Sequence, residues 1–244
     1  FGGDAASIAI EGQADAAVFE GRLADARALL EKGIEDDEKA AREEALGRKL
    51  ALLGAIHAAT GQNARALQAA ERARKATNAD PVLFQAGLAF LAAGDDRKAK
   101  SIADDLEKRL GIDARMYGMV LNGAVATRRK AHVEAVAKLK AAVQLVDAWP
   151  ARYALGRAYL EAGAYPQAQQ ELEAVVARRG EATDVFLQIV PTYRYFGQAQ
   201  YHLARAQEAQ KSPVAVETYK AFLAAKRGND DPLIADAKKR AGVP

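Results

Sequence analysis

The sequence predicts an all-α protein built from repeated helical hairpins. Half of its 244 residues are hydrophobic but only 7% are aromatic, and alanine supplies much of the apolar fraction. This composition suits closely packed helices better than sheets, which need more β-branched and aromatic residues. Small and large residues also recur at intervals of 33 to 36 residues, which indicates a repeat architecture. We therefore expect a right-handed α-solenoid that ends in a capping helix.

Two independent markers define the repeat. A small residue in the first helix of each unit recurs at intervals of 33, 36 and 33 residues: Gly54, Gly87, Gly123 and Gly156. An alanine in the second helix recurs at the same intervals: Ala66, Ala99, Ala135 and Ala168. The small residue lets the second helix approach closely, and the A-x3-L-x2-A pattern that follows presents an apolar stripe to its neighbours.

The ends of the expected helices carry matching signals. Gly61, Gly94 and Gly163 are placed to end first helices, since glycine tolerates positive φ. Pro81 and Pro150 fit the first turn of the helices that follow. The unit around 116–149 lacks a turn glycine and has "TRRK" in its place.

This pattern resembles the tetratricopeptide repeat. The best match, 149–182, has seven residues in register: Leu155, Gly156, Tyr159, Gly163, Tyr165, Ala168 and Leu172. The units at 47–80 and 80–113 also match, whereas 116–149 is degenerate, with Ala126 at the tyrosine position. The resemblance implies a solenoid whose first helices line a concave, partner-binding surface.

The repeat register sets the expected boundaries within one solenoid over 1–244. Hairpins are expected near 4–35, 36–80, 80–113, 114–148, 149–180 and 191–227, with an insertion at 181–190. A capping helix is expected at 230–241, because Asp230 or Asp231 can cap it, Pro232 fits its first turn, and basic residues end it.

Several classes of function are disfavoured by what the sequence contains. The net charge of +3 comes from 35 basic and 32 acidic residues of alternating sign, so no nucleic-acid partner is expected, even at the basic run 128–130. No cysteine is present, and the three histidines lie on different hairpins, so we expect neither a metal site nor a cofactor. Adjacent carboxylates fit helix caps or solvated faces, and we predict no enzyme activity.

Two observations bear on context. No apolar run approaches the roughly 20 residues of a membrane helix. The chain starts with Phe1 rather than Met, so we expect a processed protein or an excised part of a longer one, and its compartment stays open.

Carrying the concave positions of tetratricopeptide repeats onto this sequence predicts seven partner-binding residues: Phe84, Leu88, Val120, Tyr153, Arg157, Tyr201 and Arg205. The motifs "YALGRA" and "YHLARA" repeat a tyrosine and an arginine one turn apart, a pair suited to a peptide carboxylate or acidic side chain. A structural alternative stays open, in which the arginines pair with glutamates of adjacent helices and the tyrosines fill space. Within 191–207 we expect Tyr193 to pack on the insertion and Tyr201 to face the groove.

The last sixty residues or so also resemble the C-terminal repeat region of bacterial signalling proteins that carry a serine/threonine kinase or winged-helix domain. The likeness rests on "PTYRY", on Y-x-L-x-R-A-x-E from Tyr201, and on "YKAFL" at 219–223. We predict a protein-interaction or sensory module that binds a peptide or partner protein in its groove. The rival is a structural scaffold that self-associates, with its groove filled by its own insertion.

Overall fold

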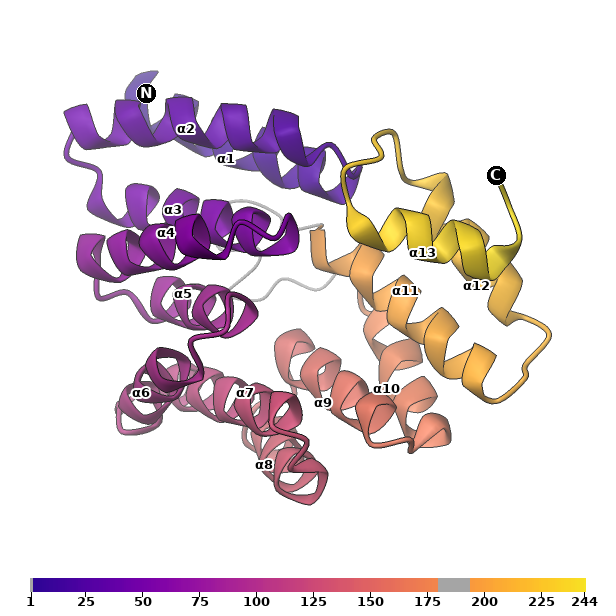
Figure 1. Ribbon diagram of the computed structural model, residues 1–244. Coiled ribbons are helices and arrows are strands. Elements are labelled where there is room, and N and C mark those ends of the chain that lie inside the picture. The colour runs from indigo at the N-terminus through magenta and orange to yellow at the C-terminus, as the bar shows by residue number, and fades with distance from the viewer. Residues whose placement is uncertain (1, 180–193) are drawn as a thin grey trace.

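The structure, a computed structural model, describes residues 2–179 and 194–244 (Figure 1). Within these ranges the chain is helical, without strands. The helices are α1 (Gly2–Phe19), α2 (Leu23–Lys39), α3 (Glu43–Ala59), α4 (Asn63–Ala76), α5 (Asp80–Ala92), α6 (Asp96–Glu107), α7 (Ile112–Arg128), α8 (His132–Leu145), α9 (Trp149–Glu161), α10 (Tyr165–Ala177), α11 (Arg194–Ala209), α12 (Ala215–Ala224) and α13 (Pro232–Ala241). Successive antiparallel pairs stack side by side, which confirms the predicted solenoid of hairpins.

The observed hairpins differ from the expected ones mainly near the N-terminus. Helix α2 runs to Lys39, and α3 starts only at Glu43, so the first hairpin extends beyond residue 35. A buried pair holds it: Lys49 Nζ of α3 lies 2.6 Å from Asp37 Oδ2 and 2.7 Å from Ser7 Oγ of α1. The expected insertion at 181–190 and Tyr193 lie outside the described residues.

Residues with positive φ close the turns inside the hairpins. Gly61, Gly94 and Gly163 have φ values of 74°, 96° and 74°, as the sequence predicted. In the degenerate unit Lys130 takes this place, with a φ of 60°. The hydrogen bonds of this turn are kept, because Ala131 N still donates to Ala126 O at 3.0 Å. A left-handed residue is thus required by the turn even where glycine is missing.

The recurring small residues confirm the predicted close approach of paired helices at most positions. A Cβ on Gly123 would lie 2.4 Å from Leu139 of α8, and one on Gly156 would lie 2.8 Å from Leu172 of α10. Gly87 differs, because its nearest neighbour is Leu121 of α7 in the next hairpin, at 2.3 Å. The same kind of marker therefore serves contacts within and between hairpins.

Helix α13 has the features expected of the capping helix. The Asp231 side chain accepts a hydrogen bond from Leu233 N at 3.0 Å, Pro232 occupies the first turn, and three basic residues end the helix. Ile234 and Ala237 bury its inner face against Tyr219 and Phe222. Among the described residues, no helix combines the length and hydropathy needed to cross a membrane.

The two ends of the array meet. The segment after α12 docks on the turn between α1 and α2, where Arg227 N and Gly228 N both donate to Glu20 O, at 2.9 and 3.0 Å. Lys226 Nζ donates to Phe19 O at 2.6 Å, and a Cβ on Gly228 would lie 2.4 Å from Gly21 O. Figure 1 shows α13 beside the end of the first hairpin. The solenoid is therefore closed on itself.

A buried arginine makes a second connection across the array. Arg194, in the first turn of α11, donates from Nη1 to Asp15 Oδ1 of α1 at 2.5 Å and from Nη2 to Gln85 Oε1 of α5 at 2.9 Å. The side chains of Arg194 and Asp15 are 7% and 1% exposed. A buried charge is tolerated only when it is paired, so α11 is held against α1 and α5.

The turns generate a first prediction. Lys130→Gly should raise the free energy of unfolding by about 0.5–1 kcal/mol, because relief of the left-handed strain exceeds the entropy that glycine adds to the unfolded chain. Chemical denaturation measures the change. Gly61→Ala is the matched control and should lower stability, since no atom lies within 4 Å of its new Cβ and only the φ of 74° opposes it. Equal effects of the two substitutions would contradict this account.

The buried pair generates a second prediction. Arg194→Met should lower the free energy of unfolding by about 3 kcal/mol, because the carboxylate of Asp15 stays buried without this cation. Adding Asp15→Asn should recover part of the loss, which a double-mutant cycle by denaturant unfolding detects. The exposed pair Arg74–Glu71 supplies the control, since Arg74→Met should cost less than about 1 kcal/mol. A loss at Arg194 no larger than at Arg74 would show that the buried pair does not hold α11.

Candidate functional site

The apolar middle of the predicted surface belongs to the core. Phe84 is 2% exposed and its ring stacks on Tyr117 of α7 with centroids 5.0 Å apart. Val120 is equally buried, and Leu88 is half-buried against the same core. The repeat register places these side chains on first helices, but neighbouring hairpins cover them. Phe84 and Val120 are therefore not accessible to a partner in this conformation.

Tyr153 of α9 is enclosed by aromatic rings. It stacks on Trp149 with centroids 5.1 Å apart and meets Tyr195 of α11 edge-on at 6.4 Å. Its hydroxyl donates to Gln198 Oε1 at 3.2 Å. Burial raises the pKa of Tyr153 to about 12. Its ring thus joins α9 to α11, which is the space-filling role of the structural alternative.

Tyr201 of α11 packs on α12 and α13 rather than facing an open groove, which corrects our expectation for this residue. The centroid of its ring lies 6.0 Å from that of Tyr219 and 5.7 Å from that of Phe222. Its hydroxyl donates to Asp236 Oδ2 of α13 at 2.5 Å, and burial raises its pKa. The physical reason is that the capping helix needs an apolar surface to cover, and Tyr201 supplies part of it.

The two predicted arginines have a different environment. Arg157 is exposed, and its guanidinium carbon lies 5.8 Å from the centroid of the Tyr153 ring. Arg205 is half-buried and donates from Nη1 to Tyr201 Oη at 3.4 Å. Within the described parts of the chain, neither guanidinium forms an ion pair with a carboxylate. The glutamate pairing of the structural alternative is therefore not found in those parts.

His202 lies between the two tyrosines and was not singled out from the sequence. Its ring centroid is 6.0 Å from that of Tyr153 and 5.3 Å from that of Tyr201. Burial, with the charges of Arg157 and Arg205, holds the pKa of His202 well below its usual range. Its Nδ1 is buried and has no hydrogen-bond partner among the described residues. The available signal was its spacing, since His202 lies three residues before Arg205 and shares its helix face.

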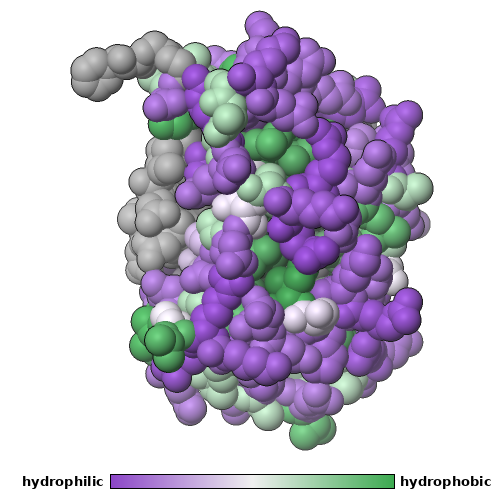
Figure 2. All heavy atoms as spheres, turned by 90° about the vertical axis from the view of Figure 1, so that its left-hand side faces the viewer, coloured by the Kyte–Doolittle hydropathy of each residue, from purple (hydrophilic) through white to green (hydrophobic). Residues whose placement is uncertain are grey.

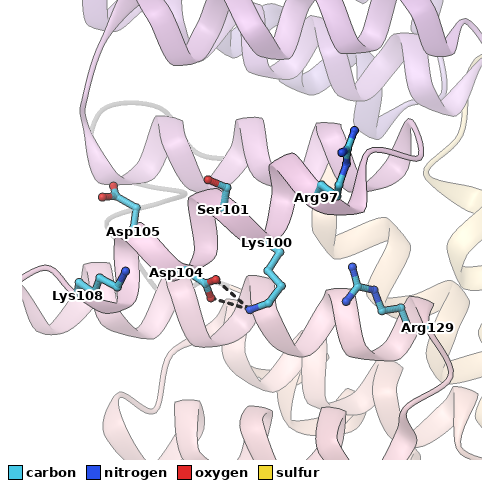
Figure 3. Close-up of a pocket in the computed structure, with 7 residues that line it drawn as sticks. All are labelled: Arg97, Lys100, Ser101, Asp104, Asp105, Lys108 and Arg129. Atoms are coloured by element: carbon cyan, nitrogen blue, oxygen red, sulfur yellow. Dashed lines mark hydrogen bonds and ion pairs between the residues drawn. The ribbon is translucent and has the colours of Figure 1, made fainter.

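A hollow lies along α6 (Figure 3). It has a volume of about 550 Å³ and is lined by Arg97, Lys100, Ser101, Asp104, Asp105, Lys108 and Arg129. Lys100 Nζ lies 2.9 Å from Asp104 Oδ1, and Arg109 pairs with Asp105. The predicted basic run is nearby, and its Arg128 and Arg129 both pair with Asp96. This hollow is a solvated face on which opposite charges neutralise one another.

Figure 2 shows that one whole face of the molecule is mainly polar, as this hollow is. That face is predominantly hydrophilic, with separate small hydrophobic patches. Across the described residues, no group of three or more histidine, aspartate or glutamate side chains is placed to hold a metal ion. The row formed by Arg157, Tyr153, His202, Tyr201 and Arg205, called the arginine row below, is therefore the strongest candidate site.

Comparison with known proteins identifies the fold. No protein-family model and no curated protein matches the sequence. Among solved structures, a tetratricopeptide repeat protein from Parabacteroides merdae aligns over 98% of this chain and 99% of its own, at 13% identity and a TM-score of 0.58. Pseudomonas aeruginosa pilF aligns over 98% of this chain and 100% of its own, at 14% identity and a TM-score of 0.50.

A third similar structure is larger. The Cut9–Hcn1 hetero-tetramer of the APC/C aligns over 90% of this chain at 16% identity and a TM-score of 0.52. This chain spans only 39% of the length of that one. Identities this low establish shared architecture alone. The repeated hairpins, their turn residues and these alignments together show that the chain has the tetratricopeptide-repeat fold.

Proposed function

We propose that the chain is a non-catalytic protein-interaction module that holds an acidic segment or a C-terminal carboxylate of a partner at Arg157 and Arg205. One observation carries the proposal. Most arginines of the described chain pair with carboxylates, as Arg48, Arg109 and Arg152 do. Arg157 and Arg205, at equivalent positions of two first helices, do not. Their charge is therefore available to a ligand.

The tyrosines position these arginines. The Tyr153 ring lies beside the guanidinium of Arg157, and the Tyr201 hydroxyl accepts a hydrogen bond from Arg205. Both rings are fixed by the core, so each guanidinium rests on an immobile support. Of the seven predicted contact residues, the proposal retains the arginines as ligand contacts and assigns the tyrosines to positioning them.

The fold supports an interaction role. Each repeat presents equivalent positions to a shared surface, which suits recognition of an extended partner. The Cut9–Hcn1 structure is that of a hetero-tetramer, so in that protein a similar fold belongs to an assembly. The likeness of the C-terminal sixty residues to bacterial kinases and winged-helix regulators stays a prediction, and so does a role as the regulatory part of a longer protein.

The contact between the two ends of the array disfavours the alternative hypothesis of a self-associating scaffold. Repeat arrays stack end to end through their terminal helices, but here the first hairpin and the segment after α12 bind each other. End-to-end assembly would have to break these contacts. The alternative in which the chain fills its own groove is supported in part by the start of α11. There Arg194 contacts α1 and α5, and Tyr195 and Phe196 contact Trp149 of α9.

A binding experiment tests the proposal. Peptides with a free C-terminal carboxylate or an acidic stretch, and their amidated or glutamine counterparts, are titrated into the full chain by calorimetry. Arg157→Ala should weaken binding of the carboxylate peptides about tenfold, and so should Arg205→Ala, because each removes one charge-assisted hydrogen bond.

Arg97→Ala is the matched control, because Arg97 is an exposed arginine of α6 that also forms no ion pair with a carboxylate in the described chain. It should leave binding unchanged. Thermal unfolding of each variant distinguishes binding from structure. Unchanged affinity, or a loss of several kcal/mol in stability at Arg157 or Arg205, would reject the proposed role.

A further inference from the structure

The arginine row presents hydrogen-bond donors in excess of acceptors. Arg157 lies at one end of the row and Arg205 at the other, and the imidazole of His202 lies between them. Asp236 of α13 lies next to the row, but its carboxylate already accepts hydrogen bonds from the Tyr201 hydroxyl at 2.5 Å and from Arg240 Nε at 2.5 Å. The two guanidinium groups and the imidazole thus share no carboxylate acceptor among the described residues.

His202 brings to the row a ring nitrogen without a partner. A half-buried imidazole normally donates one N–H to a protein acceptor, yet Nδ1 of His202 has none in the described chain, as is also true of Nδ1 of His57 and His132. Its ring contacts with Tyr153 and Tyr201, one tilted and one edge-on, hold the imidazole in place without giving Nδ1 a partner. An unsatisfied nitrogen between two cations is costly when the site is empty, and an anion with several oxygens would satisfy all three side chains at once.

We propose that Arg157, His202 and Arg205 bind one oxyanion together, and that His202 takes up a proton when the anion is bound. This inference rests on the proposed function, in which the anion is a carboxylate of the partner. The shared chemistry is a planar or tetrahedral group with at least two negatively charged oxygens, so a carboxylate and a phosphate are the two sources to distinguish.

The charges around His202 set the sign of the effect. Arg157 faces it from α9 and Arg205 from its own helix, while Tyr153 and Tyr201 flank it as neutral phenols. Without an anion, burial and the two arginines keep His202 neutral. A bound anion offsets the two positive charges and raises the pKa of His202. Affinity should therefore rise as the pH falls, by at most about tenfold per pH unit.

The same reasoning applies to stability. The pKa of His202 is lower in the folded chain than in the unfolded chain, so the unfolded state binds the proton more readily. The contribution of His202 to stability is therefore lost progressively as the pH falls from the unfolded value of about 6.5 towards the lower folded value. A bound anion reduces this loss, because it raises the pKa in the folded state.

Histidine NMR tests the inference directly. The Cε1 proton resonances of the three histidines are assigned with His202→Gln and titrated with pH in chloride, in acetate and in inorganic phosphate, all at the same ionic strength. The expected result is a rise in the pKa of His202 with acetate or phosphate and none for His57. The larger rise identifies the preferred oxyanion. A peptide with a free C-terminus, compared with its amidated form, then shows whether a partner carboxylate is a source.

His57 is a matched internal control. It also lies near two arginines, Arg27 and Arg65, but the nearby Glu31 offsets them and pairs with Arg27 at 3.8 Å. An anion effect that is specific to the arginine row should therefore leave the pKa of His57 unchanged. Equal shifts at both histidines would indicate general screening and overturn the inference.

Two variants complete the test. The rise should disappear in the double variant Arg157→Gln and Arg205→Gln, and a rise that persists there overturns the inference. If the arginine variants lose peptide binding while the pKa of His202 never moves with anion, the inference fails and the proposed function stands. If acetate raises the pKa of His202 but no carboxylate peptide binds, the anion site stands and the proposed function fails.

Discussion

The buried guanidinium of Arg194 is the constraint on which the arrangement of the C-terminal half depends. It is almost fully enclosed and is satisfied by Asp15 of α1 and Gln85 of α5, so α11 can start at only one place in the array. That start places Tyr195 and Phe196 against Trp149. Two turns later the same helix brings His202 beside Tyr153. The candidate site therefore owes its geometry to a polar contact at the start of α11, about two turns before His202.

Repeat periodicity was enough to predict the hairpins, their turns and the capping helix, because these depend on local signals. Glycine at positive φ, proline in the first helical turn and an alanine–leucine stripe each act within about one repeat. The turn at Lys130 shows the limit of residue identity, since backbone geometry was kept where the marker glycine was lost. Bounds near residue 40 were less accurate, because Ala41 also adopts a φ of 53° there without a sequence signal.

The site was harder to predict because it depends on contacts between distant residues. Periodicity placed Phe84, Tyr153 and Tyr201 on first helices, but it could not show that neighbouring helices would cover them. The Arg194–Asp15 pair joins residues 179 positions apart, a separation at which a single sequence gives no signal. The arginines, predicted from their repeat positions, remain in the proposal because a guanidinium on a long stem reaches beyond the ring that supports it. His202 was not predicted as a site residue, because its role in the proposal depends on its position next to Arg157 and Arg205 in the folded chain.

Closure changes what an array of this fold can do. An open solenoid adjusts to a partner by small rotations at each repeat, and its free terminal helices can stack on other copies. Here the backbone of 227–230 is hydrogen-bonded to the turn after α1, and Lys226 is buried between Phe19 and Phe222. A rotation at one hairpin must therefore be compensated elsewhere or break this contact. Such a rigid frame favours recognition by a few fixed, charged groups over an adaptable apolar groove, because fixed donors lose little entropy when they bind an anion. The arginine row, mounted on rings that the core immobilises, has the properties that this constraint requires.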